Sequence, residues 1–279
     1  MPKEIQVVFT GGDIAWNIDR VYDMNGQFDE EKSVGGSVYY CAIGARAALR
    51  DLGVGVVGNI GEDFPLDHLC QRGIDITGVK VSPQEPTAQF LLEQFPGNKR
   101  KFSAVRGAAE HVDTTIFPDT YRKAQYIHLS TGLPQHQMEW IKFFQNNHVP
   151  ATLSADTFEQ FVLDHPEKTR SVLAQIQLMF INEDELDYLR EQGEVSYTIP
   201  TILKRGSQGA VYIENDYSVS IPAPAVTAVE TTGAGDVLAG AFLALRSADM
   251  PIDKELEHAV AIASESVTKF GIEHILSYE

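Results

Sequence analysis

Near its C-terminal end the chain reads ETTGAGDVLAGAF, residues 230–242, with two glycines and an acid ahead of an apolar run. Gly233 and Gly235 can adopt backbone angles closed to other residues, so successive amides can turn toward one anion. The run Val237–Arg246 has helical periodicity, which would place these amides at a helix N-terminus, where the dipole attracts negative charge. Two interpretations are open: a helix cap with Asp236 in its first turn, or a phosphate cradle beside a carboxylate.

The composition limits the classes of partner. The chain has 279 residues, is 43% hydrophobic and 22% charged, and carries a net charge of −17. Such a negative field argues against nucleic acid or an anionic membrane as a partner. We find no signal peptide, no membrane span and only two cysteines, so a cytoplasmic protein is expected.

Short β-rich runs alternate with stretches of helical periodicity along most of the chain. This alternation predicts an α/β fold, with a mostly parallel central sheet and helices on both faces. The expected strands are Ile5–Thr10, Val54–Ile60, Tyr126–Ser130, Ala151–Ala155, Leu178–Asn182, Thr201–Lys204 and Ala210–Glu214. The expected helices are Gln137–Gln145, Asp184–Glu191, Val237–Arg246 and Glu255–Phe270.

Two segments break this alternation, at about residues 14–34 and 87–105. The first is polar and rich in turn residues, whereas the second reads as two strands joined by a Pro-Gly-Asn turn. A hairpin inserted into an α/β chain is a candidate lid over the carboxyl ends of the strands. Because no linker rich in Pro, Gly or Ser divides the chain, residues 1–279 are expected to form one domain with a small β lid.

The stretch T-T-G-A-G-D-x-x-x-A-G-A-F resembles the C-terminal signature of the ribokinase-like carbohydrate kinases, also called the phosphofructokinase-B type. Other landmarks of this family follow in matching order along most of the chain. They are Gly35-Gly36, Gly61-Glu62-Asp63, Arg72-Gly73-Ile74-Asp75, Gly107-Ala108, Asn182-Glu183-Asp184-Glu185 and Lys204-Arg205-Gly206-Ser207-Gln208-Gly209. The resemblance implies a ribokinase-like fold and an ATP-dependent kinase that phosphorylates a hydroxyl of a small sugar or polyol.

The resemblance also implies catalytic roles for residues of the opening stretch. The amides of Gly233, Ala234 and Gly235 would form an anion hole for the transferring phosphoryl group, and Asp236 would take the proton of the acceptor hydroxyl. A helix N-terminus is expected to lower the pKa of Asp236, which suits a base only because a loose transition state releases the proton late.

ATP and Mg²⁺ are the cofactors that the resemblance implies. The nucleotide-binding candidates are Asn182, Lys204, Gly206, Gly209 and Thr232. Asn182 and Glu185 match the family pair that holds the Mg²⁺–phosphate region, largely through water, although Asn followed three residues later by Glu is also a capping box. Both roles could coexist. Glu230 replaces the usual Asp ahead of the threonine pair, so a K⁺ site is doubtful.

The acceptor-binding candidates are Asp19, Gly35, Gly36, Tyr40, Arg106 and Asp156, with Asp13 also within reach. Asp19 falls where the family carries an acid aimed at sugar hydroxyls, and the two glycines would let the backbone approach the substrate. Tyr40 takes the place of the family's Asn, so the acceptor need not be ribose.

Other functions stay open. A nucleoside kinase or a cyclitol kinase of the same fold would use the same Asp236, with Tyr40 stacking on a nucleobase. A degenerate relative would serve as a sugar-binding or regulatory protein, although the intact Gly233–Asp236 stretch argues against this. Family members often dimerise through the lid, so a homodimer is possible.

Overall fold

The structure is a computed structural model that describes residues 4–97, 99–191, 193 and 199–277. Within these residues, nine strands form the central sheet, and only the last two in chain order, at one edge of the sheet, run antiparallel to their neighbours. In spatial order the strands are β13 (Tyr217–Ile221), β12 (Ala210–Glu214), β11 (Thr201–Lys204), β10 (Leu178–Asn182), β9 (Thr152–Asp156), β8 (Tyr126–Leu129), β1 (Val7–Thr10), β4 (Val54–Gly61) and β5 (Ile74–Ser82). The predicted mostly parallel sheet is therefore confirmed.

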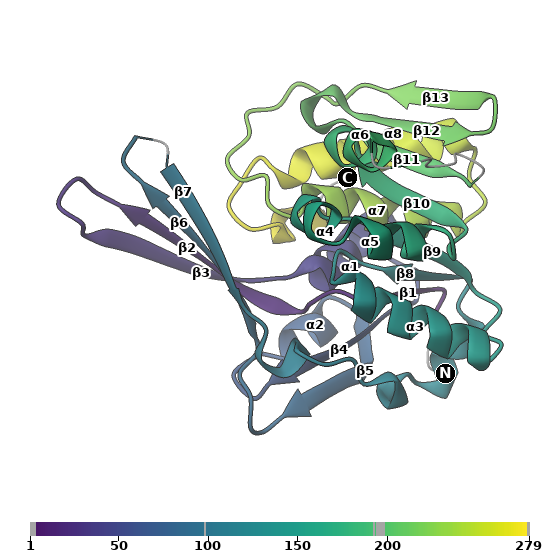
Figure 1. Ribbon diagram of the computed structural model, residues 1–279, viewed down its shortest axis with the longest axis horizontal. Coiled ribbons are helices and arrows are strands. Elements are labelled where there is room, and N and C mark those ends of the chain that lie inside the picture. Colours follow the sequence, from purple (N-terminus) through teal and green to yellow (C-terminus); the bar gives the residue numbers. More distant parts are fainter. Residues whose placement is uncertain (1–3, 98, 192, 194–198, 278–279) are drawn as a thin grey trace.

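Helices cover both faces of this sheet, as Figure 1 shows. One face packs on α1 (Ser37–Ala48), α2 (Asp67–Gln71), α7 (Ala234–Arg246) and α8 (Ile252–Ser266). The other packs on α3 (Pro134–Asn146), α4 (Glu159–Asp164), α5 (Pro166–Leu173) and α6 (Glu183–Glu191). Alternate residues of β1 serve the two cores, since Val7 and Phe9 join the first and Val8 the second. Among the described residues, none of the helices has the length and apolar character to cross a membrane.

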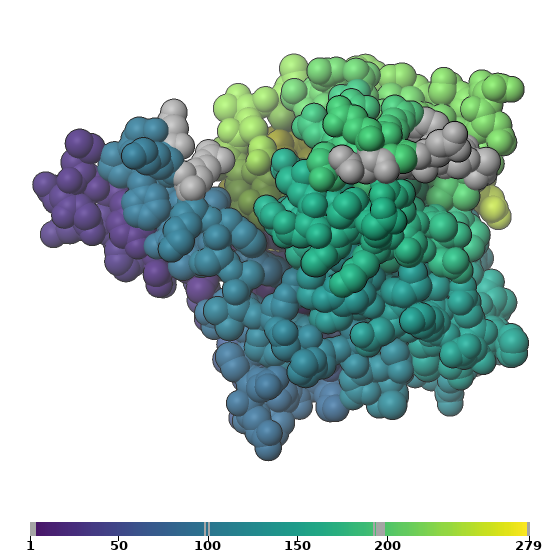
Figure 2. Space-filling model, in the orientation of Figure 1, coloured from purple at the N-terminus to yellow at the C-terminus, as the bar shows by residue number. Residues whose placement is uncertain are grey.

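A second, four-stranded sheet projects from one side of the body (Figures 1 and 2). Its strands, in spatial order, are β3 (Phe28–Gly35), β2 (Ala15–Tyr22), β6 (Ala88–Phe95) and β7 (Lys99–Val105). The two predicted strands in residues 87–105 are present, whereas residues 14–34 form a further strand pair in place of turns. Most of β3 is exposed, so it lacks the apolar alternation by which a strand is recognised.

Helices α1 and α7 pack with their backbones almost in contact. A Cβ atom added to Gly240 would lie 1.8 Å from the carbonyl oxygen of Cys41, and one added to Gly44 would lie 2.3 Å from that of Val237. Only glycine permits such an approach. This contact holds the residues at the start of α1 beside those at the start of α7, where the candidate site lies.

Short 3-10 helices connect several of these elements. They span Gly107–Ala109, Thr114–Ile116, Asp119–Lys123, Gly206–Gln208 and Glu273–Ser277.

Candidate active site

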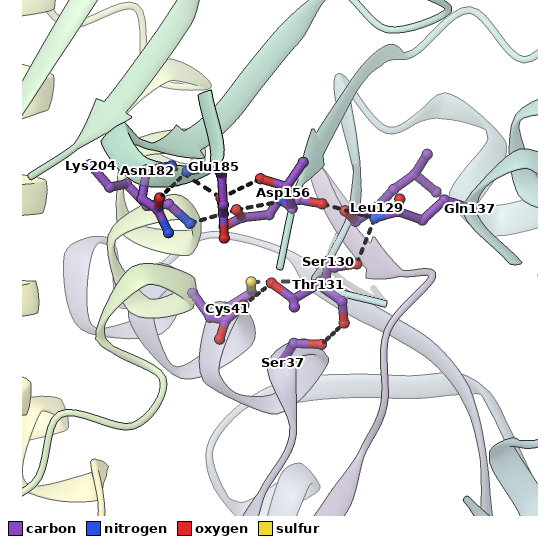
Figure 3. A network of polar contacts seen from close by, with 12 residues as sticks. Ser37, Cys41, Leu129, Ser130, Thr131, Gln137, Asp156, Asn182, Glu185 and Lys204 are labelled. Atoms are coloured by element: carbon purple, nitrogen blue, oxygen red, sulfur yellow. Dashed lines mark hydrogen bonds and ion pairs between the residues drawn. The ribbon is translucent and has the colours of Figure 1, made fainter. Parts of the chain in front are cut away.

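Polar side chains from several distant parts of the chain meet at the carboxyl edge of the central sheet (Figure 3). Asp156 ends β9, Asn182 ends β10 and Lys204 ends β11, while Asp236 lies in the first turn of α7. Carboxyl ends of parallel strands share one edge, which is where open α/β sheets bind ligands. The topology thus brings together residues that are 80 positions apart, between Asp156 and Asp236.

Asp236 is half-buried, and its Oδ1 accepts a hydrogen bond of 3.1 Å from the hydroxyl of Thr131. Burial, and next the negative charge of Asp156, raise the pKa of Asp236 to about 7, against the opposing effect of Lys204. The expectation of a lowered pKa is wrong, because burial, which disfavours the charged form, is the largest effect on this carboxyl group. A carboxylate with a pKa near 7 is well suited to accept a proton at neutral pH.

The backbone ahead of Asp236 turns at Gly233, which has φ 78° in the left-handed region. The amide of Ala234 donates to the carbonyl oxygen of Thr231 at 3.3 Å, so one of the three expected donors already has a partner. In the described part of the chain, the amides of Gly233 and Gly235, the other two expected donors, have no acceptor, and neither has that of Asp236. Unpaired amides at a helix N-terminus are able to bind an anion.

Lys204 forms a buried ion pair beside these amides. Its Nζ lies 2.5 Å from Asp156 Oδ1, and the two side chains are 16% and 0% exposed. Burial alone would lower the pKa of Lys204, but the charges of Asp156 and Glu185 raise it overall. A Cβ atom added to Gly235 would lie 3.3 Å from Lys204 Nζ, so the ammonium group is adjacent to the N-terminus of α7.

Asn182 and Glu185 form the predicted capping box at the start of α6. The Glu185 amide donates to Asn182 Oδ1 at 2.8 Å, and the Asn182 amide donates to Glu185 Oε2 at 3.2 Å. The same carboxylate oxygen accepts a bond of 2.6 Å from the Thr157 hydroxyl. These bonds fix the orientation of the buried Glu185 side chain, which lies close to Asp156 at the end of β9 (Figure 3).

The other nucleotide-binding candidates lie around this cluster. Gly206 is exposed with open space around it, whereas Gly209 is buried, with φ 95° and no room for a side chain beside Ile221. Thr232 is exposed in the loop before α7. In the same loop, Glu230 Oε2 accepts a bond of 3.0 Å from the Gly271 amide, which ties the loop to the C-terminal segment.

On the lid side, Asn17 and Tyr40 form a buried pair. Asn17 Nδ2 donates to the Tyr40 hydroxyl at 2.5 Å, while Asn17 Oδ1 has no hydrogen-bond partner among the described residues. The Tyr40 ring is only 4% exposed and covers Gly233, whose Cβ position would lie 2.2 Å from a ring atom. This conformation leaves no ring face for stacking on a nucleobase.

The glycine pair before α1 is required by protein contacts. The Cβ position of Gly35 lies 2.5 Å from the Asn17 side chain, and that of Gly36 lies 2.2 Å from the Asp13 carbonyl oxygen. These contacts account for both glycines, and their predicted approach to a substrate stays a prediction. Asp19 is half-buried on β2 opposite Glu31, and burial together with Glu31 raises its pKa.

Asp13 and Arg106 form a second buried ion pair. Arg106 Nη1 lies 3.5 Å from Asp13 Oδ2, with the two side chains 17% and 8% exposed. Burial raises the pKa of Asp13 to about 6, although Arg106 opposes this effect. Asp13 follows Gly12, where an added Cβ atom would lie 2.6 Å from the carbonyl oxygen of Thr131. Thr131 in turn bonds Asp236, so the pair lies at the same edge of the sheet as Asp236.

Three polar residues of the site were not singled out from the sequence: Asn17, Thr131 and Thr157. None belongs to a recognisable motif. Thr131 and Thr157 each lie just beyond the end of a buried strand, and that position is the signal by which they could have been found.

A kinase-type site is thus defined by a carboxylate with a raised pKa, unpaired amides at a helix N-terminus and a lysine at an adjacent strand end. Residues 31–277 match the pfkB family of carbohydrate kinases, and the chain belongs to this family. Its fold is ribokinase-like. Over 82% of this chain and 86% of the other, it is 23% identical to a cytidine kinase of Thermococcus kodakarensis. It is 28% identical to an ATP-dependent ribose-1-phosphate kinase of Halopiger xanaduensis, over 95% of this chain and 93% of that one.

Solved structures agree on the fold. A nucleoside kinase of Methanocaldococcus jannaschii, an archaeal member of the ribokinase family, superposes with a TM-score of 0.79. The match covers 97% of this chain and 94% of that one at 18% sequence identity.

Proposed function

We propose that the chain is a single kinase domain, with lid segments at about residues 14–34 and 87–105, that transfers the γ-phosphoryl group of ATP to a hydroxyl of a small uncharged sugar or polyol. The observation that carries this proposal is the juxtaposition of Asp236, with its raised pKa, and the unpaired amides of Gly235 and Asp236. The Asp236 carboxylate would accept the proton of the acceptor, while the amides would bind the negatively charged phosphoryl oxygens.

In the reaction, the acceptor oxygen forms a bond to the γ-phosphorus. The bond from that phosphorus to the β,γ-bridging oxygen breaks, and its electron pair leaves with ADP. The acceptor proton passes to the Asp236 carboxylate, while the free amides at the start of α7 bind the equatorial oxygens of the transferring group. Lys204 adds a positive charge on the nucleotide side.

The residues present fit a magnesium–nucleotide complex. Asp156 Oδ2 is buried and receives no hydrogen bond from the residues that the structure describes, and Glu185 adds a second carboxylate to the cluster. Such oxygen donors suit Mg²⁺, which keeps several of its waters in nucleotide sites. Among the described residues, no three His, Cys, Asp or Glu side chains converge closely enough to bind a metal directly. Asn182, Glu185 and Asp156 would therefore hold it largely through water. When bound, Mg²⁺ neutralises phosphate charge.

The charges around the acceptor side favour an uncharged substrate. Arg106 is paired with Asp13, and the carboxylates of Asp19 and Glu230 act on Tyr40 together with that of Asp236. This excess of negative charge disfavours acceptors that carry phosphate or carboxylate groups. Asn17 Oδ1, a buried acceptor without a partner, is suited to bind a sugar hydroxyl.

A nucleoside kinase is the second candidate, because a cytidine kinase is among the relatives. Its base would need a recognition surface other than the buried ring of Tyr40.

The test is an acceptor panel with ATP and Mg²⁺ in which ADP release is followed. The panel contains ribose, other pentoses and hexoses, myo-inositol, cytidine, inosine and ribose 1-phosphate. The expected result is turnover of a neutral sugar or polyol that falls by about 10²–10⁴-fold in Asp236→Asn. Preferred turnover of a nucleoside selects the second candidate. Binding without turnover, or preferred turnover of ribose 1-phosphate, contradicts the proposal.

A further inference from the structure

The Thr131 side chain makes a single, directed contact with the proposed base. Thr131 follows β8 in the loop Ser130–Gly132, and its Oγ1 donates to Asp236 Oδ1 at 3.1 Å. Asp236 lies 105 positions further along the chain, on α7, so this hydrogen bond joins two separate elements. It occupies one carboxylate oxygen and leaves Oδ2 for an acceptor hydroxyl.

The loop that carries Thr131 is fixed from two sides, as Figure 3 shows. The Ser37 hydroxyl, at the start of α1, donates to the Thr131 carbonyl oxygen at 2.7 Å. From the opposite side, buried Gln137 donates through Nε2 to the carbonyl oxygens of Ser130 at 3.1 Å and Asp156 at 3.0 Å. The backbone that carries the Thr131 side chain is thus held on both sides, and the hydroxyl is directed at Asp236 by its own hydrogen bond.

Gly12, in the loop after β1, packs against both Ser37 and Thr131. A Cβ atom added there would lie 2.1 Å from Ser37 Oγ and 2.6 Å from the Thr131 carbonyl oxygen. The loop after β1, the start of α1, the loop after β8 and the start of α7 therefore meet around Thr131.

We propose that Thr131 is a positioning residue, which orients the Asp236 carboxylate so that Oδ2 faces the acceptor hydroxyl. The inference rests on the proposed function, which makes Asp236 the base. The hydrogen bond between Thr131 and Asp236 can nevertheless be tested without measuring turnover. When the acceptor proton reaches Oδ2, Thr131 keeps donating to Oδ1, so the carboxyl group does not rotate during the transfer.

A hydrogen bond to an ionised carboxylate also stabilises the charged form. Thr131 lowers the pKa of Asp236, against burial and the charges of Asp156 and Glu185, which raise it. The other charged or titratable groups that act on Asp236 are Lys204 on β11 and Tyr40 and Cys41 on α1. None of these groups lies on Thr131, so removal of the Thr131 hydroxyl leaves their effects on the pKa of Asp236 in place.

The experiment compares Thr131→Val, which keeps the shape and removes the donor, with Thr131→Ser, which keeps the donor. Ser130→Ala is the matched control, since the Ser130 hydroxyl faces Cys41 Sγ at 3.6 Å and not Asp236. The ionisation of Asp236 is followed by ¹³C NMR in protein with labelled aspartate, the resonance being identified by its loss in Asp236→Asn.

We expect Thr131→Val to raise the titration midpoint of Asp236 by about one pH unit. Thr131→Ser and Ser130→Ala should leave it in place. With an acceptor that the panel identifies, the acid limb of the pH profile of kcat should move by the same amount, while the KM for ATP is unchanged. Should Thr131→Val not fold, Ser37→Ala, which frees the Thr131 backbone, is expected to raise the midpoint by a smaller amount.

An unmoved midpoint in Thr131→Val, or equal shifts in the Val and Ser variants, would overturn the proposal. So would a higher KM for the acceptor with an unmoved acid limb, because Thr131 would then be binding substrate directly. If the wild-type protein phosphorylates no acceptor, the proposed function fails, whereas the NMR titration still decides the contact.

Discussion

Lys204 Nζ and Asp156 Oδ1 lie 2.5 Å apart at the ends of two strands that both border β10. The carboxylate is fully buried, and the ammonium group is adjacent to Gly235 at the start of α7. Lys204 thus neutralises a carboxylate of the protein in the absence of nucleotide. Under the proposed function, the same ammonium group would also meet a phosphate of the nucleotide.

This ion pair predicts a non-additive effect of substitution. Lys204→Met should reduce the free energy of unfolding by about 3–5 kcal/mol, because it leaves a buried carboxylate without its cation. Adding Asp156→Asn should restore much of the loss, but not the affinity for ATP. Urea unfolding and nucleotide titration of both single variants and the double variant measure these quantities. Additive losses of stability would show that the two groups do not interact.

The fold was largely predictable because β strands buried on both faces have continuous apolar sequences. The strands Leu178–Asn182, Thr201–Lys204 and Ala210–Glu214 are found where they were expected. Strand β5 was missed because its burial is interrupted by exposed positions, and β13 because it is a largely exposed edge strand. Neither has the pattern of a doubly covered strand.

The site was predictable to the extent that it resides in local motifs. The stretch around Asp236 and the Asn182–Glu185 pair are recognisable because their spacing has a physical meaning on a helix. Contacts such as Asn17 with Tyr40 depend on tertiary packing, and no local spacing encodes them. The pKa of Asp236 was misjudged for the same reason, since its largest determinant is burial.

Asp236→Asn should lower the activity of the protein and raise its stability. We expect turnover to fall by about 10²–10⁴-fold, the range typical of general acid–base groups. The pKa of Asp236 in the folded protein, about 7, exceeds its ordinary value of 3.8. Ionisation therefore costs stability, and this cost is absent below about pH 4 and fully present above about pH 7.

Removal of this charge should raise the Tm of Asp236→Asn by roughly 2–4 °C at pH 8 and leave it unchanged near pH 4. Thermal unfolding at the two pH values, beside initial-rate assays, checks both parts. A Tm that falls at pH 8 would show that the carboxylate is stabilised by its surroundings.

Tyr40→Phe isolates the hydroxyl that holds Asn17. The ring, which covers Gly233, stays in place, so unfolding should be easier by only about 1 kcal/mol. Without its partner the Asn17 amide is free to reorient, and the KM for the acceptor should rise several-fold while that for ATP is unchanged. Tyr39→Phe is the matched control on the same helix, because the Tyr39 hydroxyl bonds Glu273 at 2.7 Å. Equal changes of KM in the two variants would rule out a specific role for Tyr40.

Gly233→Ala tests how tightly the anion-binding turn is packed, with Gly26→Ala as its control. The two glycines have nearly the same backbone conformation, with φ 78° and 80°, so alanine pays the same left-handed penalty of about 1–2 kcal/mol at both. They differ in their surroundings, since the Cβ position of Gly233 lies 2.2 Å from the Tyr40 ring and that of Gly26 has no atom within 4 Å.

Gly233→Ala should therefore lower the free energy of unfolding by more than Gly26→Ala does, and by at least about 1 kcal/mol more. It should also reduce kcat, because displacement of Tyr40 moves the amides that receive the phosphoryl group. Adding Tyr40→Ala removes the clash and should recover part of the lost stability, whereas kcat stays low. If Gly233→Ala and Gly26→Ala prove equally stable and active, the ring does not constrain this turn.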